Sequence, residues 1–448
     1  MRVNYPAERY GACGAQGRHL ITATMSYAPP HERDPMGWCF AIAIAFLVLC
    51  SIRLTTPEAP YFDEVHYLPA ARALLEGATY PNREHPLFGK EAIAAGIALF
   101  GDGPLGWRIF SLLAGTITLF AAMRALWFAS CSRPATIAYG LLLATGFALF
   151  VQSRIAMLDI FMAAFLAIAA WQFAGAVREP ETGRRRLAIT GIALGLAAAS
   201  KWNALPLLPL PGLAFLVARL HADGWRGLWS RRGAPVPGIT LPEAALWLGM
   251  VPLIAYWATF LPAYTFADGS ISQTGIIALH REMLALHESV LAPHPYQSTW
   301  PDWILNVRAI WYLYEPVDGV QRGIVLIGNP LTMLLGLGAL GWCAWVGVVR
   351  RRMDALAVFL VYAASLGLWF FAAKPVQFYY HYFVPSIALL AALALLTAEL
   401  WRDGWRWISL AIPAASIAMF AWFYPILSAA ALEGPGSFAT WMWLDSWR

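Results

Sequence analysis

Long apolar runs follow one another from Trp38 almost to the end of the chain, and they limit the possible folds more than any other feature. A helix needs about 20 residues to cross a bilayer. Eleven runs approach that length, and they centre on 38–54, 106–123, 135–150, 156–176, 187–200, 203–219, 242–262, 323–349, 355–373, 380–400 and 407–425. Only 13% of the 448 residues are charged, about half the share of a soluble domain. The pattern predicts an all-α integral membrane protein with about eleven transmembrane helices.

The lysines and arginines of the short connections orient these helices, because such residues collect on the cytoplasmic side. If the N-terminus is cytoplasmic, the inner connections carry most of them: Arg124, Arg133, Arg178, Arg184–Arg186, Arg219, Arg226, Arg231, Arg232, Arg350–Arg352, Arg402 and Arg406. The outer short connections carry one each: Arg154, Lys201 and Lys374. The N-terminus is therefore expected inside and the C-terminus outside.

This orientation divides the chain into four parts. Residues 1–37 are polar and irregular, and we expect a disordered cytoplasmic tail rather than a cleavable signal. An N-terminal transmembrane half follows at 38–262, and it includes a first outer loop at 55–105. A second outer loop spans 263–322, and a C-terminal transmembrane half spans 323–448. The two outer loops hold half of the 26 acidic residues and five of the nine histidines, so we expect an active site on the outer face of the plasma (inner) membrane.

Several classes of function are not supported by the sequence. The five cysteines form no CxxC pair, so neither a zinc site nor a disulfide framework is indicated. There is no P-loop, GxGxxG or HExxH motif. The basic residues do not form a stripe interleaved with aromatics, which argues against a nucleic-acid partner. A transporter or flippase would be favoured by inverted repeats or charges at mid-span, and no clear repeat is visible.

The first outer loop begins with an acidic pair, Asp63 and Glu64, in the stretch "YFDEVHYLPAARALL". Apolar residues at Leu68, Ala71 and Leu75 form a stripe that predicts a helix lying in the membrane interface. Carboxylates are favoured at a helix N-terminus, so capping of this helix is a purely structural explanation of the pair.

Four further charged or titratable residues stand near the outer ends of the predicted spans. His85 and Lys90 form a turn into a second interfacial helix, and Arg108 lies just inside the next span, where it could simply reach the interface. Asp159 lies in an apolar run, where an ionised side chain costs roughly 2.5–3.5 kcal/mol unless it is satisfied. A purely structural explanation of Asp159 in this position is that it pairs with Arg154 or with a hydroxyl of another span.

Three histidines, His85, His294 and His381, fall at outer span edges. A single histidine in such a position usually makes hydrogen bonds at the interface. Three on one face, beside acidic residues, leave a divalent cation open as a cofactor. We assign no metal ligand.

Several motifs resemble, in order, those of the protein O-mannosyltransferases and their bacterial lipid-linked-sugar transferase relatives. They are "DE" at 63–64, "HPLFGK" at 85–90, "GWR" at 106–108, "QSRIAMLDIFM" at 152–162, "ASKWNALPLLP" at 199–209, "IGNPL" at 327–331 and "FYYHYFVPSIALL" at 378–390. The family pattern at the second motif reads HPPLGK, so Leu87 and Phe88 depart from it. The resemblance implies a multi-span helical bundle of the GT-C fold.

The resemblance also implies a function. An enzyme of this family moves a sugar, mannose in the first instance, from a polyprenyl-phosphate donor to Ser or Thr hydroxyls of exported proteins. A lipid or glycan acceptor, as in the aminoarabinose transferases that modify lipid A, is the alternative. The expected partners are the donor, the acceptor and membrane lipids.

The chemistry requires few groups. Phosphate is already a fair leaving group, so one carboxylate must accept the hydroxyl proton and cations must hold the phosphate. Asp63 matches the family's catalytic carboxylate and is the expected general base, with Glu64 orienting neighbouring groups or binding a cation. The expected substrate-binding residues are Lys90, Arg108 and Arg154 on the phosphate, with His85, Asp159 and His381 in supporting positions.

Overall fold

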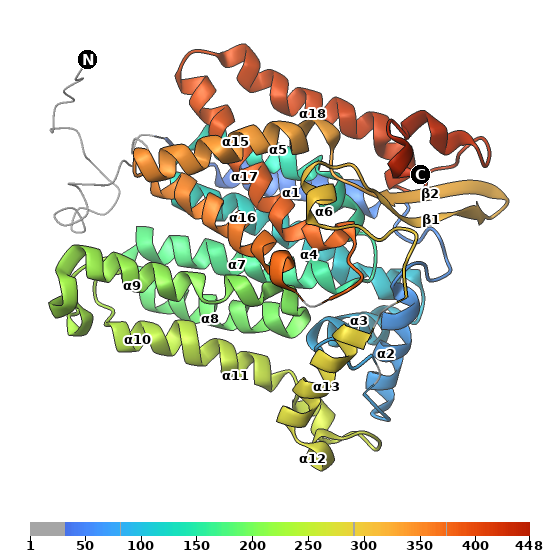
Figure 1. Ribbon diagram of the computed structural model, residues 1–448, viewed down its shortest axis with the longest axis horizontal. Helices are drawn as coiled ribbons and strands as arrows, with labels where there is room; N and C mark the ends of the chain where they lie inside the picture. The colour runs from blue at the N-terminus through green and yellow to red at the C-terminus, as the bar shows by residue number, and fades with distance from the viewer. Residues whose placement is uncertain (1–31, 81, 290–291, 373) are drawn as a thin grey trace.

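Long helices, packed side by side, make up most of the computed structural model, which describes residues 32–80, 82–289, 292–372 and 374–448 (Figure 1). The helices of the first half are α1 (Met36–Ser51), α2 (Glu64–Glu76), α3 (Phe88–Phe100), α4 (Pro104–Ser130), α5 (Arg133–Ala144), α6 (Phe147–Gln152), α7 (Leu158–Arg178), α8 (Gly183–Ser200) and α9 (Leu210–Asp223). This arrangement confirms the predicted all-α membrane fold. The predicted tail at 1–37 lies outside the described residues except for 32–37.

The second half adds shorter helices and one hairpin. Its elements are α10 (Leu241–Ala245), α11 (Val251–Ala258), α12 (Ile271–Thr274), α13 (Ile276–Ser289), α14 (Trp300–Ile304), β1 (Ile310–Val317), β2 (Val320–Leu326), α15 (Pro330–Val349), α16 (Met353–Phe371), α17 (Phe383–Arg402) and α18 (Arg406–Leu427). Short helical turns include η2 (Trp202–Leu207), η3 (Gly224–Trp229), η4 (Leu246–Met250) and η6 (Tyr379–Tyr382).

Eight helical stretches in the described part are long and apolar enough to cross a membrane. They are Pro104–Ser130, Leu158–Arg178, Trp202–Trp229, Leu241–Ala258, Pro330–Val349, Met353–Phe371, Tyr379–Arg402 and Arg406–Leu427. The remaining three predicted spans correspond to α1, to α8 and to the pair α5 and α6. The predicted number of eleven stays a prediction.

Two predicted spans differ from the helices observed. The span predicted at 323–349 begins only at Pro330, because the residues before it form strand β2. The span predicted at 135–150 is broken at Thr145 and Gly146, between α5 and α6. The amide of Asn329 donates to the Thr145 carbonyl at 3.4 Å. Such a side chain can satisfy a backbone group that a broken helix leaves free.

Two sets of helices form the core. Helix α7 packs between α4 and α8, and α17 packs against α5, α15 and α16. Helix α8 also packs against the η4–α11 stretch, and there the backbones approach closely. A Cβ on Gly191 would lie 2.0 Å from the Trp247 carbonyl oxygen, and one on Gly195 would lie 2.4 Å from that of Pro252. Only glycine permits this packing, as is common between membrane helices.

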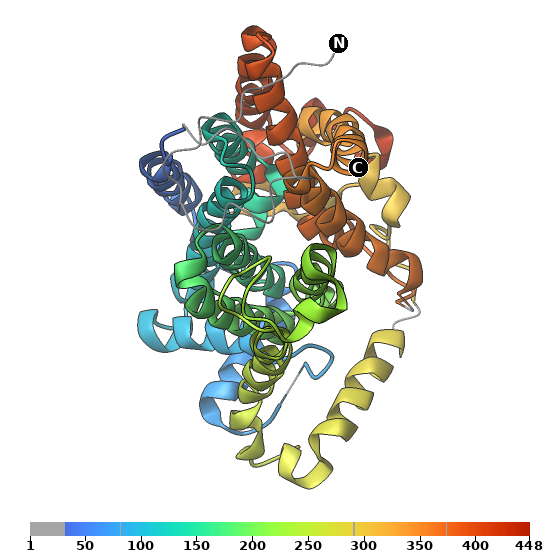
Figure 2. The same cartoon turned by 90° about the vertical axis from the view of Figure 1, so that its left-hand side faces the viewer.

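The outer elements gather at one end of the long helices. In Figure 1 the long helices run across the picture, the hairpin lies at their right-hand end near the C-terminus, and α2, α3 and α13 lie below it, farther from the C-terminus. Figure 2 is turned by 90° and shows the long helices nearly end-on. The helices predicted in the first outer loop are α2 and α3. The two outer segments are joined by backbone hydrogen bonds from Ala267 to Gly77 and from Asp268 to Ala78.

The hairpin was not predicted. Strands β1 and β2 pair antiparallel, with Val317 opposite Val320. The turn residues Asp318 and Gly319 have φ values of 54° and 75°, as a type I′ turn requires, and Asp-Gly is one of the preferred sequences for it. The hairpin lies beside the first outer loop, where Tyr312 of β1 contacts Phe62.

Candidate active site

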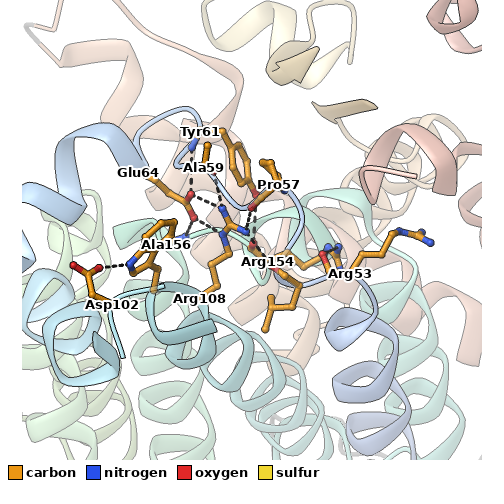
Figure 3. A network of polar contacts seen from close by, with 11 residues as sticks. Arg53, Pro57, Ala59, Tyr61, Glu64, Asp102, Arg108, Arg154 and Ala156 are labelled. Carbon is orange, nitrogen blue, oxygen red and sulfur yellow. Dashed lines mark hydrogen bonds and ion pairs between the residues drawn. The ribbon is translucent and has the colours of Figure 1, made fainter. Parts of the chain in front are cut away.

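The adjacent carboxylates Asp63 and Glu64 have different environments. Glu64 is fully buried, and its two oxygens accept hydrogen bonds from Nε and Nη2 of Arg108, each at 2.8 Å (Figure 3). The backbone N–H of Ala156 donates to the same carboxylate at 3.0 Å. Through these contacts Glu64, at the start of α2, is joined to α4 and to the segment before α7. Glu64 therefore positions the first outer loop.

Arg108 is also fully buried, and the protein itself uses all of its donors. Beyond Glu64, its Nη1 donates to the carbonyls of Leu54 and Pro57 at 3.0 and 2.7 Å, and its Nη2 donates to that of Ala59 at 3.3 Å. A guanidinium has five N–H donors, and these contacts together with those to Glu64 account for all five. These contacts argue against the expected phosphate contact at Arg108, which stays untested, and indicate that the side chain holds the 54–64 segment.

Arg154 has a similar structural role at the end of α1. It is 5% exposed. Its Nη1 donates to the carbonyls of Cys50 and Ile52, each at 2.6 Å, and its Nη2 donates to that of Arg53 at 3.1 Å. A cation at a helix C-terminus satisfies carbonyls that the helix leaves free. This placement argues against the expected phosphate contact at Arg154. Arg154 is also not the partner of Asp159.

Lys90 is enclosed beneath the turn that precedes α3. Its Nζ donates to the carbonyls of Asn82 and His85 at 2.7 and 2.8 Å and lies 4.8 Å from the centre of the Tyr80 ring. The side chain is fully buried, and burial lowers the pKa of Lys90 to about 7. Lys90 thus ties the turn to α3, and this argues against the expected phosphate contact, which stays untested.

Lys90→Met should lower the free energy of unfolding by about 1–3 kcal/mol, because two buried carbonyls would lose their donor. Thermal unfolding in detergent would measure the change as a lower melting temperature. A surface lysine that served only to bind an anion would leave that temperature unchanged, so an unaltered melting curve would contradict this structural role of Lys90.

Asp63 is half-buried, and its carboxylate accepts no hydrogen bond from any described residue. The helix-capping explanation of this carboxylate is therefore wrong, since the side chain caps nothing at the start of α2. Burial raises the pKa of Asp63, the charge of Lys201 lowers it, and the charge of Asp159 raises it again. A carboxylate with free oxygens and a raised pKa is suited to accept a proton.

The backbone beside Asp63 has an uncommon conformation. The φ of Phe62 is 52°, in the left-handed region, where a non-glycine residue costs on the order of 1–3 kcal/mol. The Phe62 ring stacks on that of Tyr312 in β1, with their centres 3.9 Å apart. This contact links the hairpin to the first outer loop and holds the backbone from which the Asp63 side chain extends.

Lys201 and Lys374 complete the charged cluster around Asp63. The Nζ of Lys201 donates to Oδ2 of Asp159 at 2.7 Å and lies 4.9 Å from the centre of the Tyr380 ring. Lys374 is half-buried. Burial and the charge of Lys201 lower the pKa of Lys374 to about 8, and the charges of Asp63 and Asp159 act against this. Asp159 is half of an ion pair, but its partner is Lys201 and is neither Arg154 nor a hydroxyl of another span, the two partners that the structural explanation named.

Neither lysine was among the expected site residues. A signal for both was present in the sequence, because Lys201 and Lys374 are two of the three basic residues on the predicted outer short connections. A lone positive charge on the side that normally lacks them suggests a function. The third, Arg154, has its structural role at α1.

The expected histidines lie in two places. His381 is 3% exposed and lies close to the Asp159–Lys201 pair, with its ring centre 4.5 Å from that of Tyr380. His85 lies in the turn that Lys90 ties down, with its ring centre 5.3 Å from that of His287 in α13. Burial lowers the pKa of His85 well below its ordinary value. Within the described ranges, no three His, Cys, Asp or Glu side chains form a group suited to a metal ion.

Two family models match the chain. Residues 84–240 match the model described as dolichyl-phosphate-mannose-protein mannosyltransferase, and residues 273–447 match the C-terminal four TMM region of protein-O-mannosyltransferase. The polyprenol-phosphate-mannose–protein mannosyltransferase of Mycolicibacterium smegmatis is 28% identical, and the alignment covers 94% of this chain and 95% of the relative. The enzyme of the same name from Corynebacterium glutamicum is also 28% identical, over 97% and 98% of the two chains.

Solved structures share the fold. The Pmt1–Pmt2 protein O-mannosyltransferase complex of S. cerevisiae, bound to its sugar donor, matches with a TM-score of 0.81 at 13% identity, over 94% of this chain and 93% of that one. ArnT of Cupriavidus metallidurans, bound to undecaprenyl phosphate, matches with a TM-score of 0.54 at 19% identity, over 85% and 64% of the two chains. Both similarities support the GT-C fold expected from the sequence.

Proposed function

We propose, since the chain belongs to the protein O-mannosyltransferase family, that it transfers mannose from a polyprenyl-phosphate donor to Ser or Thr hydroxyls of exported proteins. One observation carries the assignment of the reaction to this site. A carboxylate without hydrogen bonds, Asp63, lies within the electrostatic reach of two lysines, Lys201 and Lys374. Transfer from a phosphate needs these two kinds of group and no others.

The reaction is a single displacement. The acceptor hydroxyl oxygen attacks the anomeric carbon, the bond from that carbon to the phosphate oxygen breaks, and the phosphate keeps the electron pair. Asp63 takes the proton that the hydroxyl loses. Attack from the face opposite the leaving group inverts the anomeric carbon. A second carboxylate is not required, because the phosphate leaves without protonation.

The two lysines supply positive charge to the phosphate as its negative charge grows in the transition state. Lys201 is held in place by Asp159, while Lys374 makes no ion pair with any described residue. Asp159 is thus a positioning residue for Lys201. Glu64 and Arg108 affect the reaction indirectly, because they hold the segment that carries Asp63.

The residues of the site share one end of the bundle. Asp159 lies in the first turn of α7, Lys201 directly follows the last residue of α8, and His381 lies just before α17. The distribution of lysine and arginine in the short connections supports a location of this end on the outer face of the plasma membrane. That location suits a membrane-anchored donor and an exported acceptor.

A lipid or glycan acceptor is the alternative reading, and a flippase is a more distant one. Both full-length bacterial relatives described above carry a protein acceptor in their names, while the likeness to ArnT is one of fold. These observations favour the protein acceptor.

The assay that tests the proposal uses the purified protein in liposomes, labelled polyprenyl-phosphate mannose and a peptide rich in Ser and Thr. The matched control is the same peptide with every Ser and Thr replaced by Ala. We expect label on the first peptide alone. Label that appears only on added lipid or glycan, with neither peptide modified, would assign the acceptor to the alternative class.

The transfer rate should follow a bell-shaped dependence on pH. Asp63 accepts a proton only when ionised, and burial raises its pKa, so the rate should fall as pH drops through that raised value. Lys374 contributes charge only when protonated, and its pKa is lowered to about 8, so the rate should fall again above that pH. A pH series of kcat/KM for the donor measures both limbs.

Lys374→Arg tests the alkaline limb, because arginine stays protonated throughout this range. The variant should keep the acid limb and move the alkaline limb to higher pH. An alkaline limb that stays in place would show that another group controls it.

A further inference from the structure

A small pocket opens beside the charged cluster, between α7, η2, α16 and η6. Its polar lining includes Asp159, Asn203, Ser365 and His381, and the rings of Trp369, Tyr380 and Phe383 lie among apolar side chains of α7 and α17. The space inside it is small, about that of one water molecule. A polar space of this size can hold one water molecule or one hydroxyl group.

Two polar atoms in this pocket lack partners among the described residues. One is Oδ1 of Asp159, whose other oxygen binds Lys201, and the other is Nε2 of His381. Asp159 is fully buried and His381 is 3% exposed. A buried polar atom without a partner is costly. Two of them lining the same pocket indicate a ligand with hydroxyl or similar groups.

The protonation of His381 follows from its other nitrogen. The backbone N–H of Phe378 donates to Nδ1 at 3.0 Å, so Nδ1 is the acceptor and the ring proton lies on Nε2. The pocket therefore offers one donor, the N–H of His381, and one acceptor, Oδ1 of Asp159. The ring of Trp369, with its centre 3.9 Å from that of His381, holds the imidazole in this orientation.

We propose that this pocket recognises a hydroxyl group of the donor sugar, with His381 Nε2–H donating to it and Asp159 Oδ1 accepting from it. The proposal rests on the function proposed above. A sugar hydroxyl donates one hydrogen bond and accepts others, so it matches both orphan atoms. The pocket has room for one hydroxyl group of a sugar, in the place that a water molecule would otherwise take.

Asp159 then has two tasks at once. Its Oδ2 holds Lys201, which lies beside the phosphate, while its Oδ1 contacts the sugar. Binding of the correct sugar is thereby linked to the position of the Lys201 charge, which stabilises the departing phosphate. Specificity for the sugar would arise at His381 and Asp159, and the polyprenyl chain would contribute none of it.

The test uses a set of polyprenyl-phosphate mannose donors that each lack one hydroxyl. With the wild-type protein, one of these donors should lose on the order of 10- to 100-fold in kcat/KM, because a buried donor or acceptor in the pocket stays unpaired. If the wild-type protein uses every deoxy donor at the rate of the parent, the proposal is wrong.

His381→Asn is the sharpest variant. The asparagine oxygen can accept from the Phe378 N–H as Nδ1 does, but the shorter side chain places no N–H at the position of Nε2. The variant should lose 10- to 100-fold on the parent donor and should no longer discriminate against the affected deoxy donor. His381→Gln, whose amide nitrogen can stand where Nε2 stood, should recover part of the loss and provides a second test.

Inhibition by polyprenyl phosphate that carries no sugar separates sugar recognition from a general defect. His381→Asn should leave this inhibition unchanged. An equal loss on every donor, together with weaker inhibition, would overturn the proposal and show that His381 is structural. A wild-type protein that uses no polyprenyl-phosphate sugar at all would overturn the proposed function itself, and this inference with it.

Discussion

Asp63→Asn should lower the rate of mannose transfer by about 10²- to 10⁴-fold, the usual contribution of a positioned general base. The asparagine has nearly the same shape, but its amide cannot take the proton of the acceptor hydroxyl at neutral pH. Because the Asp63 carboxylate makes no hydrogen bond with the described residues, the substitution should leave the melting temperature nearly unchanged. The liposome assay and thermal unfolding in detergent measure the two quantities.

Asp63→Glu is the matched control, since it keeps the carboxylate and moves it by one methylene. It should retain more activity than Asp63→Asn but less than the wild type, because the base must lie within hydrogen-bond reach of the hydroxyl. Full activity in Asp63→Asn would remove Asp63 from the reaction and leave Asp159 as the remaining carboxylate of the cluster.

Much of the fold could be predicted from the sequence, because a bilayer imposes a strong rule on helix length and hydrophobicity. The apolar runs gave the helices, with errors at the β1–β2 hairpin and at the break between α5 and α6. The hairpin contains an Asp-Gly pair between apolar residues. This pair indicates a hairpin turn, but a pattern of apolar runs alone does not reveal it. The break falls at Gly146 inside an otherwise apolar run, and the amide of Asn329, distant in the chain, contacts the carbonyl of Thr145 there. An isolated glycine in an apolar run is a weak signal, because membrane helices commonly contain glycine.

The site was predicted less well, for a specific physical reason. Lys90, Arg108 and Arg154 stand where a phosphate-binding residue could stand, but each is bound by backbone carbonyls. Every residue carries a carbonyl, so the sequence cannot show which ones converge on a given cation. The pairing of Lys201 with Asp159 was missed in the same way, because the two lie 42 residues apart.

Glu64→Gln should lower the free energy of unfolding by about 3–5 kcal/mol, the usual effect of breaking a buried ion pair from one side. The glutamine keeps the shape and removes the charge, so the buried guanidinium of Arg108 loses its counter-charge while its bonds to the carbonyls of Leu54, Pro57 and Ala59 remain. Thermal unfolding in detergent should show a clearly lower melting temperature.

The matched control is Asp102→Asn, which breaks the other bidentate ion pair of the first outer loop, Arg72–Asp102. Both of its side chains are at least 40% exposed, and exposed pairs contribute only about 0–1 kcal/mol. Asp102→Asn should therefore melt close to the wild type, and Glu64→Gln well below it. If Glu64→Gln instead melts like Asp102→Asn and loses as much transfer as Asp63→Asn, then Glu64 takes part in the reaction, as the sequence first suggested. In that case the sequence motif would have indicated the role of Glu64 correctly, and the buried ion pair with Arg108 would contribute little to stability.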